Sequence, residues 1–443
     1  MGLNDRLKQS SLAGAPPGGH NEDYQRLKQS LHTRLIEQID LAALGKLEAV
    51  ELRTELMRWI STLLGGEDLP LSRREREGLV EELCDEIVGL GPLEALLRDT
   101  TISDILVNTH RAVYVERSGR IEKTATRFRD DEHLIQTINR IVNRIGRRVD
   151  ETSPMVDARL PDGSRVNAII PPLAVDGPIL SIRRFGGRPL AMPDLVNLGS
   201  LLPAMAVFLE CCVRARLNVL ISGGTGSGKT TMLNALSAAI LDHERIITIE
   251  DAAELQLQQP HVVRLETRPP NVEGQGGVVT RDLVRNSLRM RPDRIIVGEV
   301  RGGEILDMLS AMNTGHEGSM ATLHANTPRD ALTRISAMVG MSGVTVSEQN
   351  LVQMVSRSID LVVQLVRGSD GKRRVSSISE LVGTEGTMVQ LQELFQFRQT
   401  GVDEGGRVQG RFLATGVRPR CLERLARAGV EPPPGVLTTE GMG

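Results

Sequence analysis

Apolar residues recur at three-to-four spacing along the first part of the chain. This spacing predicts an amphipathic helical segment over residues 31–70. Ser72 followed by Glu75 forms a capping box, so a further helix is expected from there to about Val88. Residues 1–30 are polar and lack the period, and we expect them to be a disordered tail.

The pattern changes near residue 100, where short apolar runs separated by turn residues replace the helical period. A helix is expected at His133–Ile145, between pairs of strands. The strands are expected near 105–107, 113–115, 166–170 and 179–182. Residues 71–187 therefore predict a mixed α+β domain. The stretch Gly-Gly-Arg-Pro at 186–189 predicts a linker.

From 188 to 385, apolar strands alternate with helices. The strands are expected at 219–221, 246–249 and 295–297, and the helices at 231–241, 283–288 and 305–312. This alternation predicts an α/β domain with a parallel sheet and helices on both faces. Residues 386–443 carry glycine and proline and predict a small C-terminal appendage.

Composition narrows the function classes. The net charge is −3 and aromatic residues make up 2% of the chain, which disfavours a dedicated nucleic-acid binder. The four cysteines form no C-x-x-C pair, which argues against a zinc ribbon and fits a reducing cytoplasm. The longest apolar run, 201–213, is broken by Glu210 and is too short to span a bilayer. We therefore expect a cytoplasmic protein whose membrane role is peripheral.

One motif carries a specific chemistry. A strand precedes it and a helix follows it, as in the phosphate loop of a P-loop ATPase. Glycines let backbone N–H groups point inward, a lysine reaches the β and γ phosphates, and a Thr hydroxyl binds Mg²⁺. The predicted ATP-binding residues are Gly223, Gly224, Thr225, Gly226, Ser227, Gly228, Lys229, Thr230 and Thr231, with Thr230 as the Mg²⁺ ligand.

Two acidic motifs follow the phosphate loop. The strand at 295–297 ends in Gly-Glu, so Glu299 alone serves where an Asp usually stands beside a P-loop. Glu250, Asp251 and Glu254 cluster just past another strand, at the edge where open α/β sheets bind ligands. One of these acids is a plausible general base for the attacking water. A helix start enriched in acids would explain the same cluster.

Two histidines, His316 and His324, flank a short apolar stretch. A histidine after a core strand can sense the γ-phosphate or bridge to a neighbouring subunit. A satisfied polar group is an equally good interpretation.

Four blocks in this order resemble the type II/IV secretion ATPase superfamily. They are a Walker A motif (223–230), an Asp box (250–254), a Walker B motif ending in Gly-Glu (298–299) and a His box (316–324). Further stretches resemble its CpaF/TadA branch, the ATPases of Tad (Flp) pilus assembly, and they lie at 146–151, 156–167, 288–293 and 311–316. The resemblance spans about residues 70–385.

The resemblance implies a RecA-like ATPase domain preceded by a PAS-like N-terminal domain, in a homo-hexamer at the inner membrane. It implies that Glu299 and Glu254 share water activation and metal organisation. Arg165, Arg183 and Arg184 match positions that present arginines to nucleotide in this family. A membrane platform protein would be the direct partner and pilin an indirect one, with no nucleic acid.

Two departures refine this resemblance. The tetracysteine zinc module of extension ATPases and the signature of retraction ATPases are both missing, so the direction of fibre movement stays open. Two other functions share the predicted core, namely a RecA-like nucleic-acid motor and a nucleotide-gated scaffold with negligible turnover. DNA-stimulated turnover would indicate the first, and single-turnover kinetics would separate the second.

Overall fold

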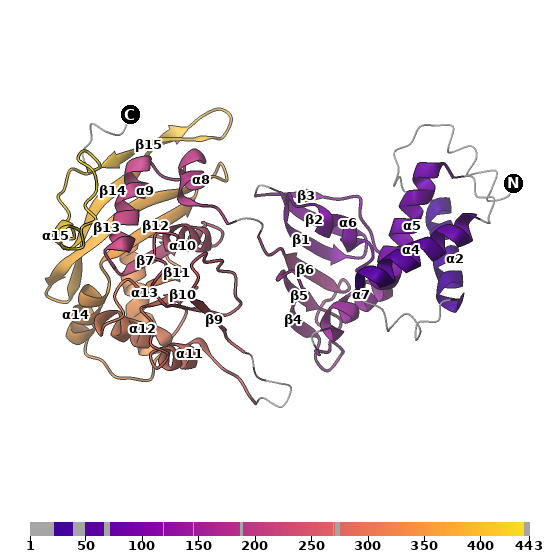
Figure 1. Cartoon of the computed structure of the whole chain (residues 1–443), viewed down its shortest axis with the longest axis horizontal. Helices are drawn as coiled ribbons and strands as arrows, with labels where there is room; N and C mark the ends of the chain where they lie inside the picture. Colours follow the sequence, from indigo (N-terminus) through magenta and orange to yellow (C-terminus); the bar gives the residue numbers. More distant parts are fainter. Residues whose placement is uncertain are drawn as a thin grey trace. The chain divides into compact units, whose positions relative to one another are not determined.

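The computed structural model describes residues 22–38, 49–65, 71–117, 119–144, 146–186, 189–268, 270 and 275–437. The chain divides into two compact units, Met1–Gly187 and Arg188–Gly443, shown in Figure 1. The division falls within the stretch 186–189 in which the sequence predicts a linker.

Three helices open the first unit, namely α2 (Glu22–Gln38), α4 (Ala49–Gly65) and α5 (Arg73–Val88). They share a core of buried leucines and isoleucines, among them Leu31, Leu56, Ile60, Leu79 and Leu83. The capping box that starts α5 is confirmed, because Glu75 N donates to Ser72 Oγ at 3.3 Å and Ser72 N to Glu75 Oε2 at 2.8 Å. Two of the otherwise unpaired donors at this helix start are thereby satisfied.

The first helix begins earlier than its apolar pattern predicts. The predicted tail is wrong for residues 22–30, which form the first half of α2. Leu27 of that segment packs into the same core as Leu31. Charged and polar residues separate the few apolar positions of residues 22–30, so the helical period is weak there. Tertiary packing, which the sequence pattern does not show, supplies the stability of this part of the helix. Residues 1–21 and 39–48 lie outside the described ranges.

A six-stranded antiparallel sheet forms the rest of the first unit, in the order β3-β2-β1-β6-β5-β4. Its strands are β1 (Ile102–Thr109), β2 (Ala112–Arg117), β3 (Arg120–Lys123), β4 (Met155–Arg159), β5 (Arg165–Ile169) and β6 (Ile179–Arg183). The helices are α6 (Leu93–Arg98) and α7 (Asp131–Asn143), and α7 presents Leu134, Ile138 and Ile141 to the sheet's core. The four predicted strands are present, and β3 and β4 are additional.

The second unit is built on a nine-stranded sheet, in the order β15-β14-β13-β12-β7-β11-β10-β8-β9. The strands from β12 to β9 in this order run parallel, and β13 to β15 continue the sheet antiparallel. Their bounds are β7 (Val219–Gly223), β8 (Ile246–Glu250), β9 (Val262–Glu266), β10 (Arg294–Val297), β11 (Met320–Leu323), β12 (Leu361–Arg367), β13 (Arg373–Glu385), β14 (Met388–Val402) and β15 (Val408–Ala414).

Helices cover both faces of this sheet, as the alternation predicts. One apolar cluster packs α8 (Met192–Asn197), α9 (Pro203–Arg214) and α10 (Lys229–Ser237) against one face. The other cluster packs α11 (Thr280–Ser287), α12 (Glu304–Asn313), α13 (Pro328–Gly340) and α14 (Glu348–Ser358) against the opposite face. The central strands are buried on both sides and read as continuous apolar runs, which is typical of parallel sheets.

The C-terminal residues belong to this sheet and do not form a separate appendage. The predicted boundary at 385–386 falls at the turn between β13 and β14, which pair along most of their length. Farther on, α15 (Leu422–Arg427) buries Leu425 in the same cluster as α9. Long-range strand pairing decides this arrangement, and the glycines and prolines mark only its turns.

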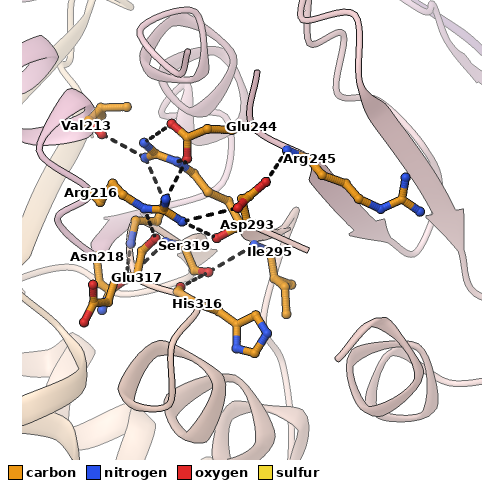
Figure 2. A network of polar contacts seen from close by, with 12 residues as sticks. Val213, Arg216, Asn218, Glu244, Arg245, Asp293, Ile295, His316, Glu317 and Ser319 are labelled. Carbon is orange, nitrogen blue, oxygen red and sulfur yellow. Dashed lines mark hydrogen bonds and ion pairs between the residues drawn. The ribbon is translucent and has the colours of Figure 1, made fainter. Parts of the chain in front are cut away.

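A buried polar network holds the amino-terminal ends of the central strands (Figure 2). Arg294, the first residue of β10, is fully buried and donates to both carboxylate oxygens of Glu244 at 2.8 Å. Its Nη1 also donates to the carbonyl oxygens of Val213 at 2.8 Å and Gly318 at 3.2 Å. Asn218 Oδ1 accepts the Gly318 N–H at 2.8 Å. These contacts fix where the strands start, and the opposite edge of the sheet carries the candidate site.

Candidate active site at the carboxyl edge of the parallel sheet

The predicted phosphate loop connects the end of β7 to the start of α10. Its curvature requires glycine, because Gly226 has φ 68° and Gly228 has φ 95°, both in the left-handed region. A Cβ at Gly223 would lie 2.4 Å from Ser227 Oγ. Ser227 Oγ is buried and has no hydrogen-bond partner among the described residues. The loop thus offers backbone N–H groups, a helix N-terminus and a hydroxyl, which together suit a phosphate group.

Lys229 lies folded against this loop. Its Nζ donates to the carbonyl oxygens of Gly223 at 2.9 Å and Gly224 at 3.1 Å. Burial lowers the pKa of Lys229 below its ordinary value; Glu299 opposes this shift, and the positive charge of Arg301 adds to it. The lysine, the acid and the arginine therefore share one electrostatic environment at this edge of the sheet.

Glu299, two residues past the end of β10, is engaged by an arginine that the sequence analysis missed. Arg301 donates from Nε and Nη2 to Glu299 Oε2, at 2.9 and 2.6 Å. Its Nη1 lies 3.2 Å from Asp251 Oδ2. One guanidinium thus joins two acids that the sequence places in separate motifs. The sequence pointed to Arg301 only by its position, two residues after the Walker B glutamate. Because arginine is common in this chain, that position alone did not single it out.

Glu250, the last residue of β8, is a buried acid. Its Oε2 accepts the N–H groups of Glu254 at 2.8 Å and Leu255 at 3.0 Å. Its Oε1 is buried without a partner among the described residues. Burial raises the pKa of Glu250 although the two N–H donors oppose the shift. The carboxyl group therefore holds the turn that carries Glu254. Of the predicted acids, Glu250 is buried in this turn, whereas Asp251 and Glu299 contact Arg301.

The two histidines lie at opposite edges of the sheet. β11 pairs in parallel with β7, so His324, which follows β11, lies on the edge of the phosphate loop. His316 precedes β11, and its carbonyl oxygen accepts the Ser319 hydroxyl at 2.7 Å within the network of Figure 2. The two ends of the predicted His box are therefore separated by a strand, and only His324 can belong to the site at the carboxyl edge.

A second arginine that the sequence analysis missed contacts the phosphate loop directly. Arg373, the first residue of β13, donates from Nε to the carbonyl oxygen of Gly226 at 2.9 Å. The preceding turn is fixed by Asp370, which accepts from both terminal nitrogens of Arg374 at 3.1 and 2.7 Å. Because 147 residues separate Arg373 from Gly226, no local pattern could have paired them.

Two of the three arginines predicted in the first unit lie in one cross-strand row. Arg165 on β5 is opposite Arg183 on β6, and Arg159 on β4 is opposite Arg165. Arg183 is also opposite Asp104, to which its Nε donates at 3.1 Å. The row therefore holds three arginines and one acid, Asp104, side by side across the strands.

Arg184 contacts backbone carbonyl oxygens, whereas its neighbour Arg183 contacts the Asp104 carboxylate. Arg184 Nη1 donates to the carbonyl oxygen of Asp99, directly after α6, and to that of Ile102 at 3.4 Å. The first bond satisfies a backbone acceptor at the end of α6, and the second reaches the first residue of β1. The predicted pair therefore splits into one arginine on the row and one that closes a helix end.

The donors at the phosphate loop fit magnesium bound together with a nucleotide. The described ranges contain no group of three or more His, Cys, Asp or Glu side chains that could hold a metal by themselves. Thr230 in α10 and Glu299 offer one hydroxyl and one carboxylate. Mg²⁺ commonly uses few protein oxygens and completes its octahedron with phosphate oxygens and water.

Comparison with known proteins agrees with this geometry. The family described as "Type II/IV secretion system protein" matches residues 86–418. The chain belongs to this family. A second family, "Type II secretion system protein E, N-terminal domain", matches residues 24–88, which include most of α2 and all of α4 and α5. As a type II/IV secretion ATPase, the chain binds nucleotide and hydrolyses ATP.

Relatives of this secretion ATPase come from conjugation and secretion systems. A putative conjugal transfer protein of Mycobacterium tuberculosis is 39% identical over 310 residues, covering 69% of this chain and 88% of the relative. The conjugal transfer protein TrbB of Rhizobium radiobacter is 32% identical, covering 71% and 91%. The type IV secretion system protein VirB11 of Bartonella quintana is 30% identical, covering 67% and 93%. In the part of the chain that the structure describes, no helix is long and apolar enough to cross a membrane.

Proposed function

We propose that the chain is the motor ATPase of a Tad (Flp) type pilus-assembly machine at the inner membrane. The observation that carries the proposal is the meeting, at one edge of one sheet, of a glycine-built phosphate loop and the acids Glu299 and Asp251. The segments at 146–151 and 156–167 that resemble the CpaF/TadA branch support the Tad assignment. In this proposal the second unit is RecA-like and residues 71–187 are PAS-like.

The phosphate loop binds the nucleotide. The backbone N–H groups of residues 223–228 and the ammonium group of Lys229 hold the β and γ phosphates. Thr230 would hold Mg²⁺ through its hydroxyl, and Glu299 would hold it through a water molecule. Bound there, the metal would supply positive charge beside the phosphates.

The acids at the carboxyl edge prepare the attacking water. Glu254 and Glu299 accept hydrogen bonds from this water and orient it in line with the γ-phosphate. Glu250 positions Glu254 through the turn that it shapes, and Asp251 fixes the arginine that contacts Glu299. In this proposal His324, which lies on the same edge, senses the γ-phosphate.

In this proposal Arg165 and Arg183, which are neighbours across β5 and β6, act as arginine fingers for the nucleotide. Six copies of the chain form the ring. Hydrolysis rotates the two units about the linker at 186–189, and this motion moves a membrane platform protein, which in turn inserts or extracts pilin. Nucleic acid has no part in this cycle.

A second candidate is a motor for conjugal transfer, which the names of the Mycobacterium and Rhizobium relatives favour. It uses the same site and differs only in the machine that the motor drives. In the host cell, deletion of the gene would abolish surface fibres if the Tad proposal is right, and would abolish plasmid transfer if the second candidate is right.

The enzymatic part is tested with purified full-length chain. Lys229→Ala removes the phosphate-loop ammonium group and is expected to abolish ATP hydrolysis, whereas Arg427→Ala, at an exposed pair in α15, leaves it unchanged. Native mass spectrometry with nucleotide and Mg²⁺ is expected to show six copies. Lys229→Ala chains that hydrolyse ATP as fast as the unsubstituted protein would refute the proposal.

A further inference from the structure

Arg301 bridges two carboxylates through its side chain while its backbone is fixed. The N–H groups of Arg301 and Gly302 donate to Glu304 Oε1 at 2.7 and 2.9 Å, which ties this segment to the start of α12. The Arg301 side chain, by contrast, is 62% exposed to solvent. The side chain can therefore change partners without moving the backbone that carries Glu299.

The two acids that Arg301 joins are not equivalent. Asp251 is anchored, because its Oδ1 accepts from the hydroxyls of Thr280 at 3.3 Å and Thr267 at 3.5 Å. Glu299 Oε2 has the guanidinium as its partner at 2.6 and 2.9 Å. An ion pair of this kind holds the Glu299 carboxylate toward Asp251 and neutralises its charge. While the pair is closed, Glu299 is a poor acceptor for water or for a metal-bound water.

We infer that Arg301 senses the terminal phosphate of a nucleoside triphosphate bound in its own subunit and, in doing so, releases Glu299. Without nucleotide, the guanidinium group is paired with Glu299. A terminal phosphate beside Lys229 is a more highly charged anion, two of whose oxygens can accept from the planar guanidinium group, and Arg301 transfers to it. A diphosphate lacks that group and leaves the Glu299 pair closed. The inference rests on the proposed function of the phosphate loop.

The electrostatics around Lys229 support this exchange. Glu299 and Arg301 both influence the pKa of Lys229, and all three residues follow the carboxyl ends of β7 and β10, which flank β11 in parallel. The charged groups around this site include the cations Lys229, Arg301 and Arg334 and the acids Glu299 and Asp251. An added phosphate is attracted by the cations and repelled by the two acids, and a contact with Arg301 offsets part of that repulsion.

Nucleotide affinities test the inference. Dissociation constants of full-length chain for ADP and for AMP-PNP, each with Mg²⁺, are measured by calorimetry. Arg301→Ala is expected to weaken AMP-PNP binding by about tenfold or more and ADP binding by less than about twofold, since a charge-assisted hydrogen bond is lost from the triphosphate complex alone. Arg301→Lys is expected to lie between Arg301→Ala and the unsubstituted chain, and Arg427→Ala, at an exposed pair in α15, to change neither affinity.

A double-mutant cycle with Glu299→Gln tests the exchange itself. Glu299→Gln frees Arg301 and is expected to tighten AMP-PNP binding severalfold. In the Arg301→Ala background, the same substitution is expected to give less than half of that gain in affinity. An equal gain in both backgrounds, or an equal loss of ADP and AMP-PNP affinity in both Arg301 variants, overturns the inference. Failure of the unsubstituted chain to bind either nucleotide would instead overturn the proposed function on which the inference depends.

Discussion

The side chain of Glu250 fills the space that a side chain at position 298 would need. A Cβ at Gly298 would lie 2.8 Å from Glu250 Cγ and 3.5 Å from its carboxyl carbon. The ends of β8 and β10 are neighbours in the sheet, so the two residues meet across the strands. The missing Walker B aspartate is therefore explained by its surroundings, since position 298 makes room for an acid from the adjacent strand.

Replacing Gly298 by Ala is expected to destabilise the second unit by about 1–3 kcal/mol, because the added methyl group displaces Glu250 and the turn that it holds. Thermal unfolding followed by circular dichroism measures the change. Gly340→Ala is the matched control, since a Cβ there meets no atom within 4 Å. A Gly298→Ala protein as stable as the unsubstituted chain would show that Glu250 moves aside freely.

The burial of Glu250 predicts a pH dependence of stability. Its pKa is raised in the folded state, so folding favours the protonated carboxyl. The stabilisation that comes from the protonated carboxyl is fully present at pH values below the pKa of Glu250 in the unfolded chain. It is lost as the pH rises through the higher pKa of Glu250 in the folded protein. Glu250→Gln is expected to flatten this fall in urea stability between acidic and neutral pH, because the amide oxygen can still accept the N–H groups of Glu254 and Leu255. An unchanged slope would place the pH dependence on other groups.

Local signals predicted the parts of the molecule that local chemistry determines. The capping box at Ser72 and Glu75 and the glycines of the phosphate loop each act within a few residues, and the structure has both. The sequence singled out Glu250 and Glu299 as candidates because they follow apolar strands. Their partners were missed, since Arg301 gives no periodic signal and the role of Gly298 depends on a strand distant in the sequence.

The C-terminal strands illustrate the same limit at the level of the fold. β14 pairs with β13, and β15 pairs with β14. The polar residues and glycines of these strands did not predict that they extend the sheet of the second unit. β12 pairs with β7, and these strands lie more than a hundred residues apart in the chain. Pairing of this kind is decided by the packing of the whole unit and not by a window of sequence.

Arg373 is expected to hold the phosphate loop in the shape that binds nucleotide. Arg373→Ala removes the donor to the Gly226 carbonyl oxygen. We expect about a three- to tenfold loss of affinity for both ADP and AMP-PNP, as for the net loss of one hydrogen bond, with little change in stability. Arg411→Ala, an exposed position on β15, is the control. A loss confined to AMP-PNP would instead indicate direct contact with the terminal phosphate.

The buried pair of Arg294 and Glu244 is expected to be the most sensitive polar contact of the second unit. Both side chains are almost fully buried, at 0% and 2% exposure, so Glu244→Gln leaves an uncompensated guanidinium group in the interior. The expected cost is about 3–5 kcal/mol. Trp59, the chain's single tryptophan, lies in the first unit, so urea unfolding of the second unit must be followed by far-UV circular dichroism.

The matched control for this pair is Glu423→Gln, whose ion pair with Arg427 in α15 is 82% exposed on both sides. It is expected to cost less than about 0.5 kcal/mol, because exposed pairs contribute little. The network of Figure 2 lies at the edge of the sheet opposite the phosphate loop. Glu244→Gln protein that remains folded should therefore keep its affinity for ADP. A loss of affinity without a loss of stability would mean that the two edges of the sheet are coupled.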